Sequence, residues 1–596
     1  MKISLTKNII SIIQYGIVAV TTVIILIILM QLWNAELNIP FKYEGDSLQV
    51  AEYIKCIIDN GWVLDNPFVG APYGKNLRDY GMSDSLHLFI MKIIGLLTGD
   101  FAATMNIYFL LTFPLTALIS FYVFKTFGIK PLLAGVGAML YAFMPYHFYR
   151  GINHLFLAAY YLIPLNVMMI LWVIRGDCDE FIDRSTYLGF NRKWIGGFVV
   201  GLVSSCAGIY YAFFSCMFLC AAGIIRMIEK QRIVPFLAAL TFTSSIIIGG
   251  LVNHIPTLVY HLREGKNPVA MARVYHEVEL YALKITHLLL PIQGHRIGFL
   301  AKKRAQYDQE SSYIYRFPQE SGSESLGLIT SIGFLIIVIV IFFPRSTLNS
   351  LELIRYLSLL TIFALIISVT GGFNSFIAPF VGFKIRAYNR VSIFLAFFSI
   401  FGLLCIIQFL FDKIHQSEKL KSNIINRWKL IDSCLVILSL FIVIFGICDQ
   451  TPKTIVPDYN AIKTKYQLDR SFISLIENTI PRYSMVFQLP YMAYPEVEPV
   501  NGLKNYEHFR AYLHSKTLRW SYGAVKGRFG DEWQKNVGLQ PVPTMVTELR
   551  QSGFKGILIN RTGYIDNGEQ IVSELSSFLQ EKALLNGDGS LLFFKL

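Results

Sequence analysis

The sequence lacks the short motifs that hold nucleotides or build the common hydrolytic sites. It has no P-loop, no GxGxxG opening a helix, no GxSxG and no HExxH. These absences remove support for nucleotide-dependent and triad chemistry. The eight cysteines include no CxxC pair and none follows Cys448, so the sequence predicts neither a disulfide framework nor a thiolate metal site.

Charge is scarce as well. Only 16% of the 596 residues are charged, while 54% are hydrophobic. This apolar surface exceeds what one water-soluble core needs, which predicts a polytopic α-helical membrane protein. The net charge of +13 comes mainly from residues between the apolar runs. The positive-inside effect accounts for that placement, so we expect no nucleic-acid partner.

The apolar runs predict about eleven membrane crossings. After Lys2 and Lys7, about two dozen nearly uncharged residues lead to Trp33. That stretch is too long for the core of a signal peptide, which favours a retained first helix. The expected crossings are residues 9–31, 101–124, 132–145, 155–174, 194–206, 209–225, 233–252, 326–343, 356–371, 390–411 and 429–448.

The basic connecting segments predict the orientation. They lie within residues 125–130, 175–193, 226–232 and 413–427. Counting the crossings places all of them on the same side of the membrane as the N-terminus. Because basic loops are enriched on the cytoplasmic side, that side should be cytoplasmic. The opposite, outer side receives residues 32–100, 146–154, 253–325 and 372–389 and the tail. We expect a transmembrane part over residues 1–449, with a large first outer loop at 32–100, and an extracytoplasmic α/β domain over 450–596.

The tail has the pattern of a small soluble α/β domain. Strands are expected at "YSMVFQLP", "GFKGILIN" and "SLLFFKL". Helices are expected at "NYEHFRAYLHS", "TMVTELRQSG" and "EQIVSELSSFLQEKA".

The first outer loop contains an acidic turn, "YEGD". Gly45 permits a turn between Glu44 and Asp46, whose carboxylates would project to the same side in an extended segment. They could share an acceptor hydroxyl or a cation. Alternatively, Asp46 and Gln49 match a capping box for the amphipathic helix "SLQVAEYIKCIID".

A second acidic segment, "RDYGMSDSLHLFIMKIIG", follows in the same loop. Its acidic residues are Asp79 and Asp84, and Asp84 precedes a helix of about a dozen residues that is too short to span a membrane. Asp84 could therefore be a cap or a second functional carboxylate.

Several outward segments carry candidate phosphate-binding cations. His147, Arg150 and His154 stand at i, i+3 and i+7 and would form one cationic face if the helix continued through Gly151. A belt of long side chains at the membrane interface is the alternative.

Two further outward segments add cations. Arg386 and Arg390 stand at i and i+4 in a short outer loop, against the positive-inside trend, and suit a lipid phosphate or a headgroup anchor. His295 and Arg296 could contact a phosphate or lie in a solvated loop.

The expected crossings are almost free of Asp, Glu, Lys and Arg. Transporters of polar cargo usually keep ionisable groups near the bilayer midplane. Here the ionisable residues cluster at the outer boundary, which suits a site that takes a lipid from the bilayer and a polar partner from outside.

This layout resembles the GT-C class of integral-membrane glycosyltransferases. The resemblance rests on the first crossing, the outer loop with "YEGD", its paired amphipathic helices, about eleven crossings and the outward tail. The stretches "GDSLQVAEYIKCIIDNGWVLDNPFVGAPYG", "MSDSLHLFIMKIIG" and "AFMPYHFYRGINHLFLAAYYLIPL" are similar to bacterial membrane glycosyltransferases, and "RAYNR" resembles YfhO-like membrane proteins. The WWD signature of oligosaccharyltransferases is absent, which disfavours protein glycosylation.

The resemblance implies an inverting transfer from a polyprenyl-phosphate sugar to a cell-envelope glycan or lipid, in the bacterial plasma membrane. It makes Asp46 the general base, with Glu44 or Asp84 as the second acidic member, because the family's adjacent Asp-Glu pair is absent here. Nucleotide sugars are cytoplasmic, so a transferase acting outside must receive its sugar on a lipid, which fits the missing nucleotide motifs.

Other interpretations remain open at this stage. One is a transporter or flippase of lipid-linked glycans, and another is a non-catalytic factor for assembly of envelope polymer. Carboxylates such as Asp46 and Asp84 could gather Mg²⁺ or Mn²⁺, although no His or Cys spacing demands a metal.

Overall fold

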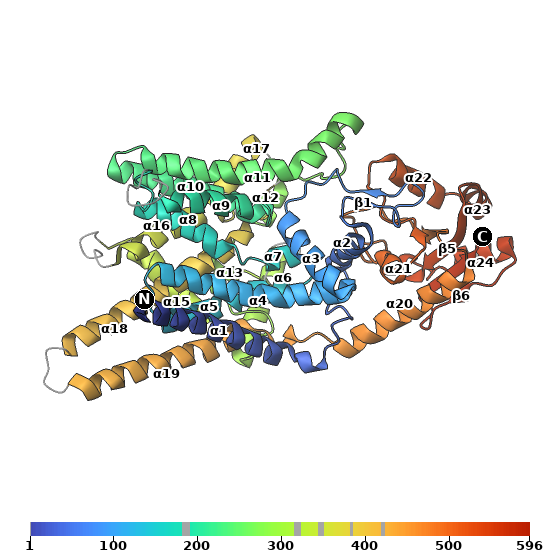
Figure 1. Cartoon of the computed structure of the whole chain (residues 1–596). Coiled ribbons are helices and arrows are strands. Elements are labelled where there is room, and N and C mark those ends of the chain that lie inside the picture. Colours follow the sequence, from blue (N-terminus) through green and yellow to red (C-terminus); the bar gives the residue numbers. More distant parts are fainter. Residues whose placement is uncertain (1, 182–190, 315–322, 344–350, 382–384, 419–423) are drawn as a thin grey trace.

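The computed structural model of the chain describes residues 2–181, 191–314, 323–343, 351–381, 385–418 and 424–596. The structure has a helical bundle at one end and a mixed sheet with its helices at the other (Figure 1). The first residues of α1 lie in the bundle at the end remote from the sheet, and the C-terminus lies with the sheet (Figure 1).

Among the described residues, six helices are long and apolar enough to cross a membrane. They are α1 (Lys2–Met30), α4 (Phe101–Thr126), α10 (Ile209–Lys230), α11 (Val234–Glu264), α18 (Ser392–Glu418) and α19 (Ile424–Gln450). The chain is therefore a mostly helical, multi-pass membrane protein.

The other five expected crossings fall on shorter helices. These are α5 (Pro131–Ala142), α8 (Ile163–Arg175), α9 (Arg192–Ser204), α15 (Gly327–Val340) and α16 (Glu352–Ser368). Each is shorter than the roughly 20 residues that an independent crossing needs, so the total of eleven stays a prediction.

The first outer loop is built from two helices and a small hairpin. Helix α2 (Asp46–Asn60) and helix α3 (Ser85–Thr98) flank strands β1 (Asp65–Asn66) and β2 (Lys75–Asn76). Both helices end at a left-handed glycine, Gly61 and Gly99, whose amides bond back into the last turn. This confirms that the loop holds two short helices.

The remaining outer segments are short helices and turns. Helix α6 (Pro145–Arg150) ends at Gly151, which has φ 47°, and α7 (Leu155–Ala158) follows. The helix does not continue through Gly151, because this backbone conformation suits only glycine, so the condition for one cationic face of His147, Arg150 and His154 is not met. The others are η1 (Leu32–Asn34), α12 (His276–Leu280), α13 (Ile285–Leu289), α14 (Gly298–Ile314), α17 (Phe373–Val381) and η3 (Tyr388–Val391).

The tail forms a five-stranded mixed sheet of order β4-β3-β5-β7-β6. Strand β3 is parallel to β4 and β5, whereas β7 is antiparallel to β5 and β6. The strands are β3 (Met485–Leu489), β4 (Arg519–Trp520), β5 (Phe554–Asn560), β6 (Leu584–Leu585) and β7 (Leu591–Lys595). The helices are α20 (Tyr459–Thr479), α21 (Phe509–His514), α22 (Phe529–Gly538), α23 (Val542–Gln551) and α24 (Glu569–Leu579), with η4 (Lys453–Ile455) and η5 (Arg561–Gly563).

Helix α20 connects the bundle to the sheet (Figure 1). At its start, the Tyr459 hydroxyl donates to the carbonyl of Met30, the last residue of α1, at 2.8 Å. Near its end, the Glu477 carboxylate accepts the backbone amides of Lys516 and Thr517 at 2.7 and 2.9 Å. Both ends of α20 are therefore fixed by hydrogen bonds.

The first outer loop packs directly against the tail sheet. The Trp520 amide in β4 donates to the Phe68 carbonyl at 2.8 Å, and the Ala71 amide donates to Trp520 at 3.0 Å. Nearby, Lys75 and Glu52 form an ion pair with both side chains fully buried. The loop thus completes the edge of the sheet beside β4.

Candidate active site

The acidic turn stands at the entry to α2. Gly45, at φ 60°, occupies the N-cap position, and its carbonyl accepts the Leu48 amide at 3.0 Å. Asp46 is the first residue of the helix, so the cap itself is glycine. A carboxylate in the first turn is favoured by the helix dipole, but the side chain remains partly exposed, at 46%.

Asp46 faces the segment that follows α6. Its Oδ2 lies 3.6 Å from Nε2 of His154, a side chain that is 36% exposed. The His154 amide donates to the Arg150 carbonyl at 3.0 Å. The structure therefore places Asp46 beside His154, which lies four residues after Arg150 in the segment that follows α6.

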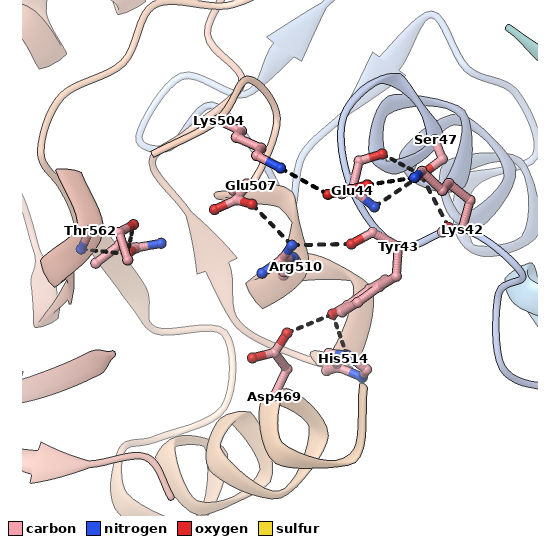
Figure 2. A network of polar contacts seen from close by, with 11 residues as sticks. Lys42, Tyr43, Glu44, Ser47, Asp469, Lys504, Glu507, Arg510, His514 and Thr562 are labelled. Carbon is pink, nitrogen blue, oxygen red and sulfur yellow. Dashed lines mark hydrogen bonds and ion pairs between the residues drawn. The ribbon is translucent and has the colours of Figure 1, made fainter. Parts of the chain in front are cut away.

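Glu44 points elsewhere. Its carboxylate pairs with Lys42 at 2.5 Å and with Lys504 of the tail at 3.0 Å (Figure 2). Hydrogen bonds from these two lysines lower the pKa of Glu44 to about 2. The contacts of the two carboxylates do not support a shared Glu44–Asp46 site, because Glu44 pairs with Lys42 and Lys504 while Asp46 lies beside His154.

A cavity of about 290 Å³ lies beside this turn, at the outer end of α1. Met30 and Phe41 line it with two cationic residues, Lys42 and Arg150. Arg150 is only 4% exposed, and its guanidinium lies 5.3 Å from the centre of the Tyr146 ring. A buried guanidinium beside a second cation and several apolar side chains is suited to a phosphate that carries a hydrophobic chain.

Asp84 and Arg390 form a second charged group. Asp84 is the N-cap of α3, yet its side chain makes no capping hydrogen bond. Burial raises the pKa of Asp84 to about 7, and the Arg390 guanidinium opposes that rise. Arg390, in η3, lies 3.9 Å from the centre of the Tyr210 ring.

Asp84 lies close to a pair of tyrosines in the bundle. A Cβ added at Gly208 would lie 3.8 Å from Asp84 Oδ1 and 3.6 Å from the Tyr211 ring. The Tyr211 hydroxyl donates to the Leu157 carbonyl and contacts the Tyr146 hydroxyl at 3.2 Å. Tyr146 in turn lies beside the Arg150 guanidinium.

Four other predicted phosphate ligands are occupied by structural contacts. His147 is fully buried, stacks on Phe113 at 3.6 Å and bonds to Thr112 at 2.8 Å, so it belongs to the core. His295 pairs with Asp449 at 3.0 Å, with both side chains buried.

The two arginines of this group are also held by protein atoms. Arg296 donates to the Thr451 carbonyl at 3.1 Å, and Arg386 pairs with Glu277. Their interaction with phosphate is not supported, since each already has a protein partner.

The described residues contain no group of three or more His, Cys, Asp or Glu side chains arranged to hold a metal ion. Asp46 and Asp84 lie in separate settings, the first beside His154 and the second opposed by Arg390.

Sequence reasoning missed the tail residues that meet the turn. Lys504 pairs with Glu44, and Arg510 donates to the Tyr43 carbonyl at 3.1 Å. These residues are more than 450 positions apart in the chain, so no local pattern reveals the contact. Lys42, two residues before Glu44, was visible as an opposite charge at close spacing.

Comparison with known families gives one match. Residues 64–372, just over half of the chain, match the family model described as "Domain of unknown function (DUF6311)". Among curated proteins, no sequence matches this chain.

Several solved structures are similar over most of the chain. The archaeal oligosaccharyltransferase AglB from Archaeoglobus fulgidus, solved with an inhibitory peptide and a dolichol-phosphate, is 12% identical, with a TM-score of 0.44 over 92% of this chain and 69% of that chain. ArnT from Cupriavidus metallidurans bound to undecaprenyl phosphate is 10% identical, with a TM-score of 0.48 over 98% and 97%. The arabinofuranosyltransferase AftD from Mycobacteria is 11% identical, with a TM-score of 0.45 over 92% and 35%.

Two of these proteins, an oligosaccharyltransferase and an arabinofuranosyltransferase, are enzymes of the kind that the sequence resembles. TM-scores below 0.5 at such low identity do not assign an activity. Function is therefore argued from the residues of this chain.

Proposed function

The chain belongs to the DUF6311 family, and we propose that it is a membrane glycosyltransferase that moves a sugar from a polyprenyl-phosphate donor to a cell-envelope glycan or lipid. The observation that carries this proposal is the region where Asp46 contacts His154, beside the cavity that Arg150 lines. It combines a partly exposed carboxylate with a buried guanidinium at the outer end of an apolar helix.

The reaction needs a base on one side of the anomeric carbon and a phosphate site on the other. Asp46 accepts the proton of the acceptor hydroxyl as its oxygen bonds to the anomeric carbon. General-base assistance of this kind contributes about 10²–10⁴-fold. The bond from that carbon to the phosphate oxygen breaks, and the sugar is transferred with inversion.

The leaving polyprenyl phosphate needs a cationic partner. Arg150 and Lys42 line the cavity where the acidic turn meets the end of α1. Positive groups fixed where negative charge accumulates stabilise the transition state. The lipid chain would remain in the bilayer while only its phosphate and sugar reach the turn.

The other carboxylates have different parts in this scheme. Glu44, with its pKa near 2 and its two lysine partners, is a poor base and holds the turn against the tail. Asp84 is the better candidate for the second acidic member, because its pKa near 7 lets it exchange a proton at neutral pH. We place the turn and the tail on the extracytoplasmic side of a bacterial plasma membrane.

The test is turnover by an Asp46→Asn variant in nanodiscs. Synthetic polyprenyl-phosphate sugars carrying a hexose or a pentose serve as donors, and mass spectrometry follows the release of polyprenyl phosphate. We expect the variant to lose about 10²–10⁴-fold in rate. Asp65→Asn is the matched control, since Asp65 lies in the same loop and pairs with Arg78 at 2.5 Å.

Binding separates the role of Asp46 from that of the phosphate site. Asp46→Asn should still retain polyprenyl phosphate in native mass spectrometry, whereas Arg150→Ala should retain less. Turnover by Asp46→Asn at the rate of the unmodified protein would exclude Asp46 as the base.

A further inference from the structure

A second polar cavity lies in the tail, apart from the turn described above. Its volume is about 210 Å³, and it is bounded by α20, α21 and the sheet. Gln488 near the end of β3, Asn560 at the end of β5 and Ser590 just before β7 all line it. The cavity is thus at the carboxyl ends of neighbouring parallel strands, where open α/β sheets commonly bind ligands.

The lining of this cavity includes the buried guanidinium of Arg510, which has one N–H donor unpaired in the described part of the chain. Arg510 is 9% exposed and donates through Nη2 to the Tyr43 carbonyl and to Glu507, both at 3.1 Å. Its buried Nε has no hydrogen-bond partner among the described residues. An unsatisfied buried donor is costly, and a ligand oxygen in the cavity would satisfy it.

The charges around the cavity restrict the class of ligand. Three carboxylates, Asp469, Glu507 and Asp588, line it with two cations, Lys465 and Arg510. Excess negative charge repels a phosphate or another polyanion, and so many charged groups reject an apolar ligand. A compound rich in hydroxyl groups fits, because each hydroxyl both donates and accepts.

We propose that this cavity binds one sugar residue of the acceptor glycan. The identification of that sugar as part of an acceptor rests on the proposed transferase function, whereas the cavity itself does not. The carboxylates accept hydrogen bonds from sugar hydroxyls, and Lys465 and the Nε of Arg510 donate to them.

Three residues that line the cavity, Asp469, Glu507 and Arg510, belong to the network of polar contacts that includes Tyr43 and Glu44 (Figure 2). Tyr43 donates its hydroxyl proton to Asp469 at 2.9 Å and accepts from Nε2 of His514 at 2.8 Å. Burial lowers the pKa of His514 to about 3, which keeps the ring neutral. Asp469 and Arg510 contact Tyr43 and also line the cavity. A sugar bound to them would therefore stabilise the position of Tyr43, three residues before Asp46.

Saturation-transfer NMR on the full-length protein in nanodiscs tests the proposal. The probes are methyl glycosides of hexoses, N-acetylhexosamines and pentoses at millimolar concentration, without donor lipid. We expect saturation transfer to at least one glycoside, and a loss of about tenfold in its affinity in Lys465→Ala and in Asp588→Ala, because hydrogen bonds to charged groups are removed.

The matched controls are Lys582→Ala and Glu581→Ala, two exposed residues of the tail that do not line the cavity. The proposal would be overturned if Lys465→Ala and Asp588→Ala bound the glycoside as well as the control variants, or if no glycoside showed saturation transfer. Asp46→Asn should bind the glycoside normally. Failure of sugar binding would leave the Asp46 result intact, and unchanged turnover in Asp46→Asn would leave the sugar site intact.

Discussion

At the residue scale, the site depends on how neighbouring carboxylates are held apart. Glu44 and Asp46 are separated only by Gly45, yet one is fixed by lysines and the other faces a histidine. The sequence predicted an acidic turn at the start of a helix, and the structure has it there, while the catalytic role of Asp46 stays a prediction. The sequence could not predict that Glu44 and Asp46 have different partners, because Lys504, which pairs with Glu44, comes from the tail.

Asp84 gives a prediction of pH dependence. Its folded-state pKa is raised from 3.8 to about 7 by burial, with Arg390 opposing the rise. The folded state therefore holds the proton more tightly than the unfolded state, and stability is lost as the pH rises from about 4 to about 7. We expect Asp84→Asn to flatten this loss, measured as the melting temperature between pH 5 and pH 8.

The matched control for this experiment is Asp59→Asn. Asp59 pairs with Lys55 at 2.8 Å on the exposed face of α2. It should leave the pH dependence of the melting temperature unchanged. If Asp84→Asn and the unmodified protein lost the same stability over this range, the Asp84 carboxyl would not be the titrating group.

At the element scale, hydrophobic and β-forming patterns predicted most of the tail. The expected strands at 483–490, 553–560 and 590–596 correspond to β3, β5 and β7. Strand β4 was missed, because a two-residue strand has no pattern of its own and is paired on one side by residues of the first outer loop. Helix α20 was also missed, although the helix is amphipathic, with apolar residues on one face.

Gly151 provides a prediction about the break between α6 and α7. A Cβ at this position would lie 2.9 Å from the Phe148 carbonyl oxygen, and φ is 47°. Gly151→Ala should destabilise the segment by about 1–3 kcal/mol and shift the Arg150–His154 turn. A lower melting temperature together with weaker retention of polyprenyl phosphate is expected.

Gly250→Ala is the control for that substitution, since Gly250 lies within α11 and has nothing within 4 Å of an added Cβ. It should be close to neutral. Normal lipid retention and melting in Gly151→Ala would show that the glycine conformation is not needed to form the site.

At the scale of the whole molecule, the first outer loop and the tail share one packed edge of the sheet. The composition change near residue 450 predicts a domain boundary there, and the apolar core around β5 and β7 is made largely by tail residues. The edge at β4, however, is covered by residues 68–71. Sequence composition cannot reveal such an exchange between distant segments.

This arrangement predicts uneven stability in a fragment of residues 450–596. Hydrogen exchange should become much faster at the Trp520 amide, because its acceptor, the Phe68 carbonyl, is absent, while the Arg519 amide keeps its acceptor in the tail, the Ser484 carbonyl. Exchange in β5 and β7 should stay slow. Equal protection of β4 in the fragment and in the full chain would contradict the shared edge.

A substitution in the full chain checks the same point if the fragment does not fold. Val69 is completely buried and forms an isolated bridge with Trp520. Val69→Asp should accelerate exchange in β4 while leaving the exchange of α4 unchanged.

Helix α20 sets a distance. With 21 residues at 1.5 Å each it is about 30 Å long, and both of its ends are fixed. Asp469, ten residues after Tyr459, lies about 15 Å along the axis from the end held by α1. Helix α20 therefore fixes the separation between the Met30 end of α1 and the tail cavity, and under the proposed function this separation limits the length of acceptor that can reach from the cavity to Asp46.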